Sequence, residues 1–107
     1  MLRIGSVVMN VSDIGRASQF WKQALGYVAS PDNPAFLGPE SGDGTRLHLD
    51  EEDRMHVDLW AANEEDQLAE VERLISLGAE RVEWNYPDNA DFVVLADPDG
   101  NLFCVIR

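Results

Sequence analysis

The chain repeats one order of local sequence patterns, and this repeat constrains its fold more than any other feature. Residues 6–10 match residues 56–60 at an offset of 50, and residues 24–28 match residues 76–80 at an offset of 52. A repeat of this kind is typical of two copies of one supersecondary unit. The chain of 107 residues is therefore predicted to form one domain from two modules, at about 1–52 and about 53–107.

Two stretches carry the signals that start and end amphipathic helices. The first begins after Ser12 or Asp13, either of which is a good helix cap, and ends at Gly26. The second begins after Asn63, carries three acidic residues in its first turn and ends at Gly78. Two aromatic residues of the first apolar stripe are expected in the core, and these are Phe20 and Trp21.

Short apolar runs between Pro, Gly, Asn and Asp predict the strands. They lie at 4–11, 27–29, 35–37, 45–50, 55–60, 81–84, 92–96 and 102–106. In two of these strands polar and apolar residues alternate, so the polar side chains share one face. That face carries His48 in one strand, and in the other it carries His56, Asp58 and Trp60. Each module is thus predicted to run strand, helix and three strands.

Composition limits the kind of partner. The chain has 8 basic and 20 acidic side chains, a formal charge of −12, and its few basic residues are not clustered, so a nucleic-acid partner is not expected. No apolar run approaches the ~20 residues that cross a bilayer, and the amino terminus lacks a signal-peptide pattern. The single cysteine cannot form an internal disulfide. A cytoplasmic protein without a membrane partner is therefore predicted.

Three segments carry a resemblance to a known family. Residues 8–21, the strand that begins with His56-Val57-Asp58-Leu59, and the closing turn Asp97-Pro98-Asp99-Gly100-Asn101 resemble the vicinal oxygen chelate superfamily. This superfamily contains glyoxalases, bleomycin-resistance proteins and extradiol dioxygenases. The chain is most similar to its small bacterial glyoxalase-like domain proteins, and the resemblance spans essentially the whole sequence.

The resemblance implies an α+β fold in which two tandem βαβββ modules form a curved mixed sheet around a cleft, with the helices outside. It also implies a homodimer. In metal-dependent members the cleft holds one divalent ion, which is ligated by the first and last strands of the modules. The ion acts there as a Lewis acid on a substrate that chelates it through adjacent oxygens.

The family's ligand positions fall on Ser6 and His56 in the first strands and on His48 and Cys104 in the last strands. Histidine, glutamine or glutamate is usual at these places. A zinc-like ion held by His48, His56 and Cys104 is chemically reasonable. The last strand has no glutamate, however, which removes the usual carboxylate ligand and base, so classical glyoxalase activity is not expected. The alternative to metal binding is that the histidines form structural hydrogen bonds and Cys104 packs as a small apolar residue.

The sequence therefore predicts a protein that binds a small molecule in the cleft, without the full metal-dependent glyoxalase site. The predicted ligand-binding residues are Ser6, His48, His56, Asp58, Trp60, Trp84 and Cys104. Two alternatives stay open: a metal-dependent lyase, isomerase or dioxygenase with one divalent ion, and a non-catalytic interaction domain. The acidic runs at 50–53 and 64–66 suit a cationic ligand, as in bleomycin resistance, or simply keep the surface soluble. No residue is assigned a catalytic role.

Overall fold

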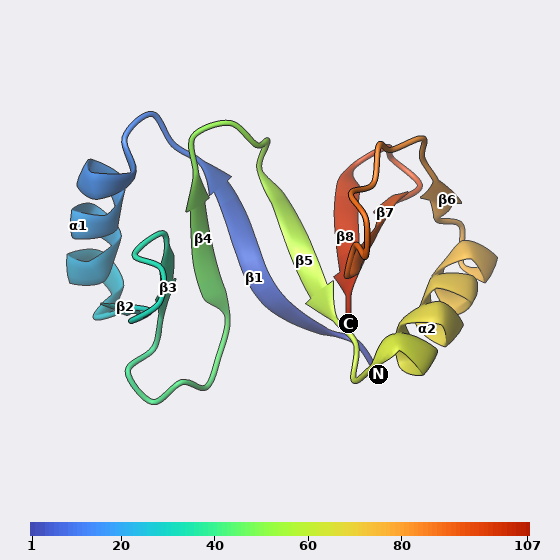
Figure 1. Ribbon diagram of the computed structural model, residues 1–107, viewed down its shortest axis with the longest axis horizontal. Coiled ribbons are helices and arrows are strands. Elements are labelled where there is room, and N and C mark those ends of the chain that lie inside the picture. The colour runs from blue at the N-terminus through green and yellow to red at the C-terminus, as the bar shows by residue number, and fades with distance from the viewer. The chain divides into compact units, whose positions relative to one another are not determined.

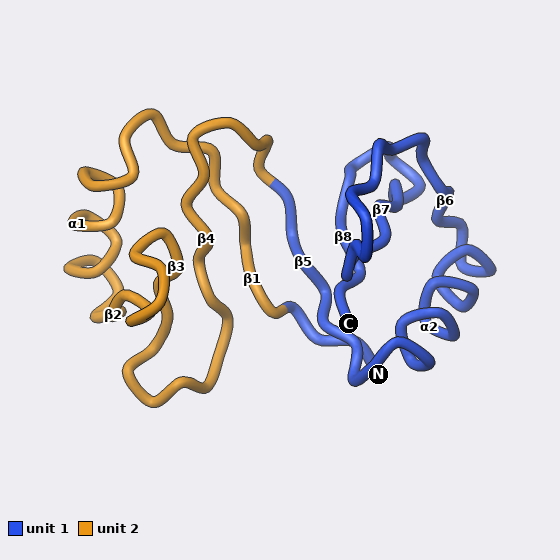
Figure 2. The backbone as a smooth tube through the Cα atoms, in the orientation of Figure 1, with its two compact units in different colours: residues 1–4, 56–107 blue, residues 5–55 orange.

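A computed structural model describes all residues, 1–107, and divides the chain into two compact units (Figure 2). We call residues Gly5–Met55 the first module, and residues Met1–Ile4 with His56–Arg107 the second module. They are orange and blue, respectively, in Figure 2.

The first module contains one helix and a four-stranded mixed sheet (Figure 1). Its strand order is β2-β3-β4-β1, with β1 and β4 parallel and the other pairs antiparallel. Helix α1 packs against β4 and β2. The elements are β1 (Arg3–Asn10, which enters this module at Gly5), α1 (Ile14–Leu25), β2 (Val28–Ala29), β3 (Phe36–Gly38) and β4 (Arg46–Asp50).

The second module has the same arrangement of one helix and four strands. Its strand order is β5-β8-β7-β6, with β5 and β8 parallel and the other pairs antiparallel. Helix α2 packs against β8. The elements are β5 (His56–Trp60), α2 (Glu64–Ser76), β6 (Glu80–Arg81), β7 (Phe92–Ala96) and β8 (Leu102–Ile106).

The core of the second module forms between α2 and one face of its sheet. Val71 of α2, Leu95 of β7 and Val105 of β8 have no exposed surface, and Ala79 joins them. Buried Gln67 fastens the helix to the sheet, since its side-chain amide donates to the carbonyls of Asp91 at 3.0 Å and Val105 at 2.9 Å. Because the Gln67 amide is hydrogen-bonded, its burial does not carry the free-energy cost of an unpaired polar group.

The predicted α+β class and βαβββ order are confirmed in both modules. The helix starts are confirmed too. Asp13 accepts a hydrogen bond from the Arg16 N–H at 3.0 Å, and Asn63 accepts one from the Asp66 N–H at 2.8 Å. Gly26 ends α1 with φ +69°, a left-handed conformation that favours glycine. Neither helix is long and apolar enough to cross a membrane.

Two expectations about the fold are wrong. The strand predicted at 81–84 is only Glu80–Arg81, because the Tyr86 hydroxyl accepts the Val94 N–H at 2.8 Å on the edge of β7 that a longer β6 would have used. Phe20 is 61% exposed rather than in the core. The inward side of α1 follows i, i+3, i+4, i+7 spacing through residues 14, 17, 18 and 21, and Phe20 lies one residue off this stripe.

Candidate functional site

The polar face of the second module's sheet carries the residues that the sequence singled out. β5 and β8 pair in parallel with Asp58 opposite Cys104, so these two side chains share a face. His56 lies two residues from Asp58 along β5 and points the same way. Phe103 and Val105, which flank Cys104 in β8, point to the other face of the sheet and contact the core beneath α2. The alternating sequence of β5 thus builds a polar cluster on the face opposite the core.

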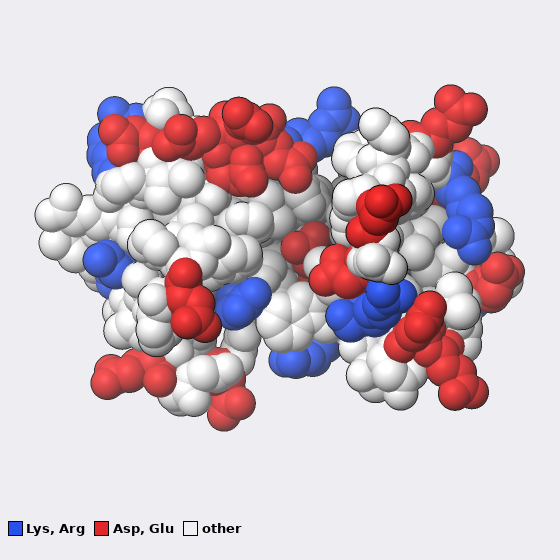
Figure 3. Space-filling model, viewed as in Figure 1, with Lys and Arg blue, Asp and Glu red and all other residues white.

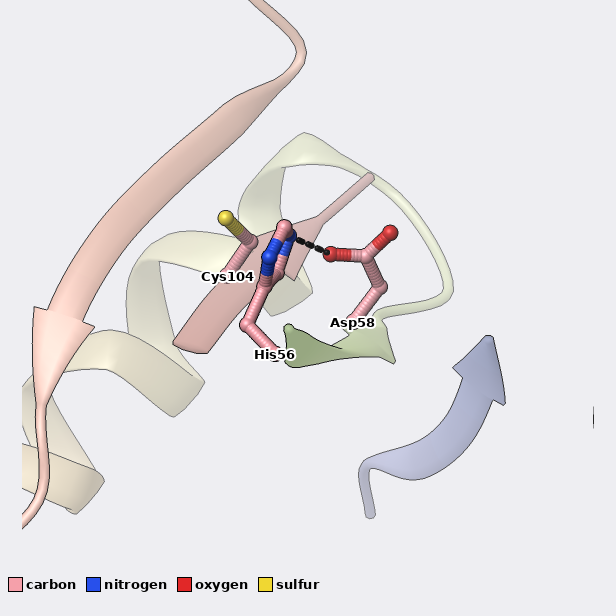
Figure 4. A group of neighbouring side chains, drawn as sticks. All are labelled: His56, Asp58 and Cys104. Carbon is pink, nitrogen blue, oxygen red and sulfur yellow. Dashed lines mark ion pairs between the residues drawn. The ribbon is translucent and has the colours of Figure 1, made fainter. Parts of the chain in front are cut away.

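Three side chains of this face lie close together (Figure 4). His56 Nε2 is 3.3 Å from Asp58 Oδ1, and the two side chains are only 10% and 13% exposed. One ligand atom from each of His56, Asp58 and Cys104 lies within 4.8 Å of the other two. The thiol of Cys104 is free of any disulfide and half-buried. We call these three residues the His56–Asp58–Cys104 cluster.

The cluster brings together an imidazole nitrogen, a carboxylate oxygen and a sulfur. These donors fit a zinc-type ion, which takes nitrogen, sulfur and carboxylate ligands. Without an ion, the carboxylate of Asp58 lies beside Nε2 of His56 and can orient the imidazole ring. The sequence predicted His48, His56 and Cys104 as metal ligands, and the structure places Asp58, a predicted ligand-binding residue, beside His56 and Cys104.

Two predicted ligand-binding aromatics of this module have different surroundings. Trp60 ends β5, and the guanidinium of Arg3 lies 4.7 Å from the centre of its ring, a cation–π contact. Trp84 lies outside the sheet, between β6 and β7, and is 45% exposed. It is not among the residues of the cluster, so its role in binding stays a prediction.

His48 of the first module lies in an aromatic stack. It is opposite Phe36 in the pairing of β3 with β4, and the two rings stack with centres 4.1 Å apart. The guanidinium of Arg46 covers the Phe36 ring at 4.9 Å, while His48 Nε2 is 4.0 Å from Asp50 Oδ2. Sequence reasoning missed this stack, because only the register of β3 on β4 shows which residue faces His48.

Ser6 is buried, with 2% of its surface exposed, on β1 next to Arg46 of β4. The predicted ligand roles of Ser6 and His48 stay predictions. The structure groups the other predicted ligands, His56 and Cys104, within one module.

Comparison with known proteins gives the family. A model of the glyoxalase-like domain matches residues 6–106. The chain therefore belongs to the glyoxalase-like domain family and, with it, to the vicinal oxygen chelate superfamily that its sequence resembles. None of the curated proteins matches the chain by sequence.

Several solved structures share the fold at low sequence identity. An NAD-dependent benzaldehyde dehydrogenase structure from Legionella pneumophila is 18% identical, with a TM-score of 0.68 over 94% of this chain and 96% of that chain. Methylmalonyl-CoA epimerase from Mycobacterium tuberculosis is 17% identical, with a TM-score of 0.62 over 96% and 85%. A glyoxalase/bleomycin resistance protein/dioxygenase superfamily member from Vibrio splendidus 12B01 is 18% identical, with a TM-score of 0.55 over 98% and 97%. Such identities show the fold alone.

Proposed function

We propose that this protein binds a small molecule over the polar face of its second module, at the His56–Asp58–Cys104 cluster. The observation that carries the proposal is the 3.3 Å pair of His56 and Asp58, largely withdrawn from solvent beside a thiol, on the sheet face opposite the core. Polar groups on a sheet face that the core does not use are well placed to orient a ligand.

The cluster favours a ligand that donates hydrogen bonds. With the Nε2 proton directed at Asp58, the Nδ1 atom of His56 would accept a hydrogen bond from a ligand hydroxyl, amide or amidine. Acidic groups outnumber basic ones on the face shown in Figure 3, in keeping with the formal charge of −12. Because a negative field raises the local concentration of cations, a neutral or cationic ligand is favoured over an anionic one.

Proton NMR of the imidazole rings tests this proposal, because the chain has only two histidines, one in each module. Benzamidine, benzamide and benzoate form a series of similar shape with positive, zero and negative charge. We expect benzamidine to shift the ring signals of His56 most and benzoate least, with much smaller shifts for His48. An H48Q variant identifies the signals and serves as the matched control, since it leaves the cluster intact. Equal shifts of both histidines, or none at saturating probe, would contradict the proposal.

A second candidate function is a metal-dependent lyase, isomerase or dioxygenase. The specific observation in its favour is that imidazole, carboxylate and thiol atoms lie within 4.8 Å of one another. A bound divalent ion would supply a Lewis acid that polarises a substrate oxygen. Elemental analysis of protein purified without a histidine tag separates the two functions. About one equivalent of metal, lost in H56A and retained in H48A, would favour the enzyme. No metal after incubation with zinc, nickel and manganese would favour the binding protein.

We also propose that the protein forms the homodimer that its family resemblance implies. Apolar side chains of the first module support an interface, since Phe20 is 61%, Leu25 48% and Val28 44% exposed. Light scattering should then give about twice the chain mass of 11.9 kDa. An F20E variant should shift the mass toward that of one chain. A single-chain mass for the wild type would reject the dimer.

A further inference from the structure

We propose that Cys104 is a covalent nucleophile toward a ligand with a conjugated carbonyl, and that His56 takes and returns the proton. This inference rests on the proposed ligand site and adds the chemical class of the ligand. Its basis is the arrangement in Figure 4, where a thiol, an imidazole and a carboxylate from two paired strands lie on one face.

The cluster contains the parts that activate a thiol. A nucleophilic cysteine needs an adjacent base, and the base needs a third group that orients it. One ring nitrogen of His56 lies within 4.8 Å of the Cys104 sulfur, so His56 serves as the base, and Asp58, whose Oδ1 is 3.3 Å from Nε2, is the positioning residue. The imidazolium that forms when His56 accepts a proton is stabilised by the same carboxylate. The other strand beside Cys104 presents uncharged Val94, so it adds no competing charge.

The backbone around Cys104 favours addition to a double bond over acyl transfer. Acyl transfer needs backbone N–H groups aimed at a developing oxyanion. β8 is paired with β5 on one side and with β7 on the other, so the sheet uses the backbone donors of this strand. Addition to a conjugated carbonyl needs no such donors at the cysteine, because the negative charge develops on the ligand's own carbonyl oxygen, away from the sulfur.

The step is balanced without a co-reactant. The thiol proton of Cys104 moves to Nδ1 of His56, and the sulfur forms a bond to the β-carbon of the ligand. The π electrons of the carbon–carbon double bond shift to the carbonyl oxygen to give an enolate. The α-carbon then takes the proton back from the imidazolium of His56. The net change is addition of S–H across the double bond, with nothing oxidised and no leaving group.

Acrylamide is a suitable probe, because Cys104 is the only cysteine and the intact mass then reports its modification alone. The reaction is run in a metal chelator at neutral pH, with the same chain unfolded in urea as the reference thiol. We expect the folded protein to react about tenfold or more faster than the unfolded chain, although burial by itself would slow it. H56A should lose this advantage, and added free imidazole should restore part of it. K22A, at an exposed position of α1 outside the predicted ligand-binding residues, is the control and should react like the wild type.

Several outcomes would overturn the proposal. They are a folded protein that reacts no faster than the unfolded chain, an H56A variant that keeps the full rate, and an H56A variant with no response to imidazole. If H56A does not fold, as judged by circular dichroism, H56Q takes its place and must lose the rate advantage. D58N should slow the reaction and D58E should recover part of the rate.

Propionamide, the saturated analogue of acrylamide, separates this inference from the proposed ligand site. If propionamide shifts the His56 signals while acrylamide shows no rate advantage, the ligand site stands and the nucleophile is rejected. Both proposals fail if propionamide and the benzamidine series leave the His56 signals unchanged and acrylamide shows no rate advantage at Cys104.

Discussion

The two modules use the same strand register to display different chemistry. In the first module Val8 of β1 lies opposite His48 of β4, and in the second module Asp58 of β5 lies opposite Cys104 of β8. At the repeat offset of 50, Ser6 occupies the place of His56. The second module therefore has histidine, aspartate and cysteine at the positions where the first has serine, valine and histidine. The shared scaffold sets where side chains point, and the residues at three strand positions decide which chemical groups meet there.

Each module also has a histidine followed two residues later by an aspartate. The pair in the first module, His48 and Asp50, has a 4.0 Å separation and side chains that are 25% and 32% exposed. The pair in the second module, His56 and Asp58, is closer, at 3.3 Å, and is 10% and 13% exposed. An imidazole and a carboxylate interact more strongly at short range and away from water. The same local sequence thus yields a loose, solvated pair in one module and a tight pair in the other.

Removing a buried leucine from either core should give the largest loss of stability. Leu37 of the first module and Leu95 of the second have no exposed surface. We expect L37A and L95A each to lower the free energy of unfolding by about 2–5 kcal/mol, because each leaves a cavity. Urea unfolding followed by circular dichroism measures this. A cost below about 1 kcal/mol for one variant alone would show that its module repacks and that the two cores are unequal.

Loss of the buried amide of Gln67 should have the next largest effect, and only in the second module. Gln67 is the fourth residue of α2, and the fourth residue of α1 is Ala17, which has no such side chain. We expect Q67L to cost about 1–3 kcal/mol, because the carbonyls of Asp91 and Val105 lose a donor. Thermal and urea unfolding are the measurements. Unchanged stability would mean that the apolar side chain offsets the lost hydrogen bonds.

The helix caps should contribute similar, smaller amounts in the two modules. Asp13 and Asn63 each accept one hydrogen bond from the backbone three residues later. We expect D13A and N63A each to reduce the free energy of unfolding by about 1 kcal/mol. D13S and N63S, which keep a capping oxygen, are the controls. A much larger loss for one alanine variant would reveal a role for that residue beyond capping.

The smallest effect should come from Asp97 in the closing turn, and it should depend on pH. The side chain of Asn101 donates to the Asp97 carboxylate at 3.0 Å, as do the backbone N–H groups of Asn101 and Asp99 at 2.8 and 2.9 Å. These hydrogen bonds lower the pKa of Asp97 from its ordinary value. Its stabilisation is therefore complete above the ordinary aspartate pKa, about 3.9, and is lost as the pH falls through the lower pKa of the folded state.

Comparing the stability of the wild type and D97N across this acidic range checks the direction of the pH dependence. The wild type should unfold at a higher urea concentration than D97N near neutral pH, and the difference should shrink as the pH is lowered. The loss of stability in D97N should be smaller than in the cap variants, because Asp97 is only partly buried and water screens its charge. A difference that grows on acidification would contradict the assignment.

Much of the fold could be predicted from local sequence. The caps at Asp13 and Asn63 and the left-handed Gly26 follow from single-residue preferences that hold in any surroundings. The polar face with His56 and Asp58 follows from the period of two in a strand. By contrast, the exposure of Phe20 and the short β6 were mispredicted, since each depends on which neighbour covers a face or an edge.

The sequence by itself determined the family, the βαβββ order of each module and the polar faces of the strands, because these depend on residue preferences and spacing along the chain. Only the tertiary structure decided which polar residues lie next to one another. Cys104 is 46 residues from Asp58 in sequence, and the parallel register of β5 and β8 makes them neighbours. Register depends on how both strands pack over the α2 core, and the same pairing brings the thiol to the His56–Asp58 pair.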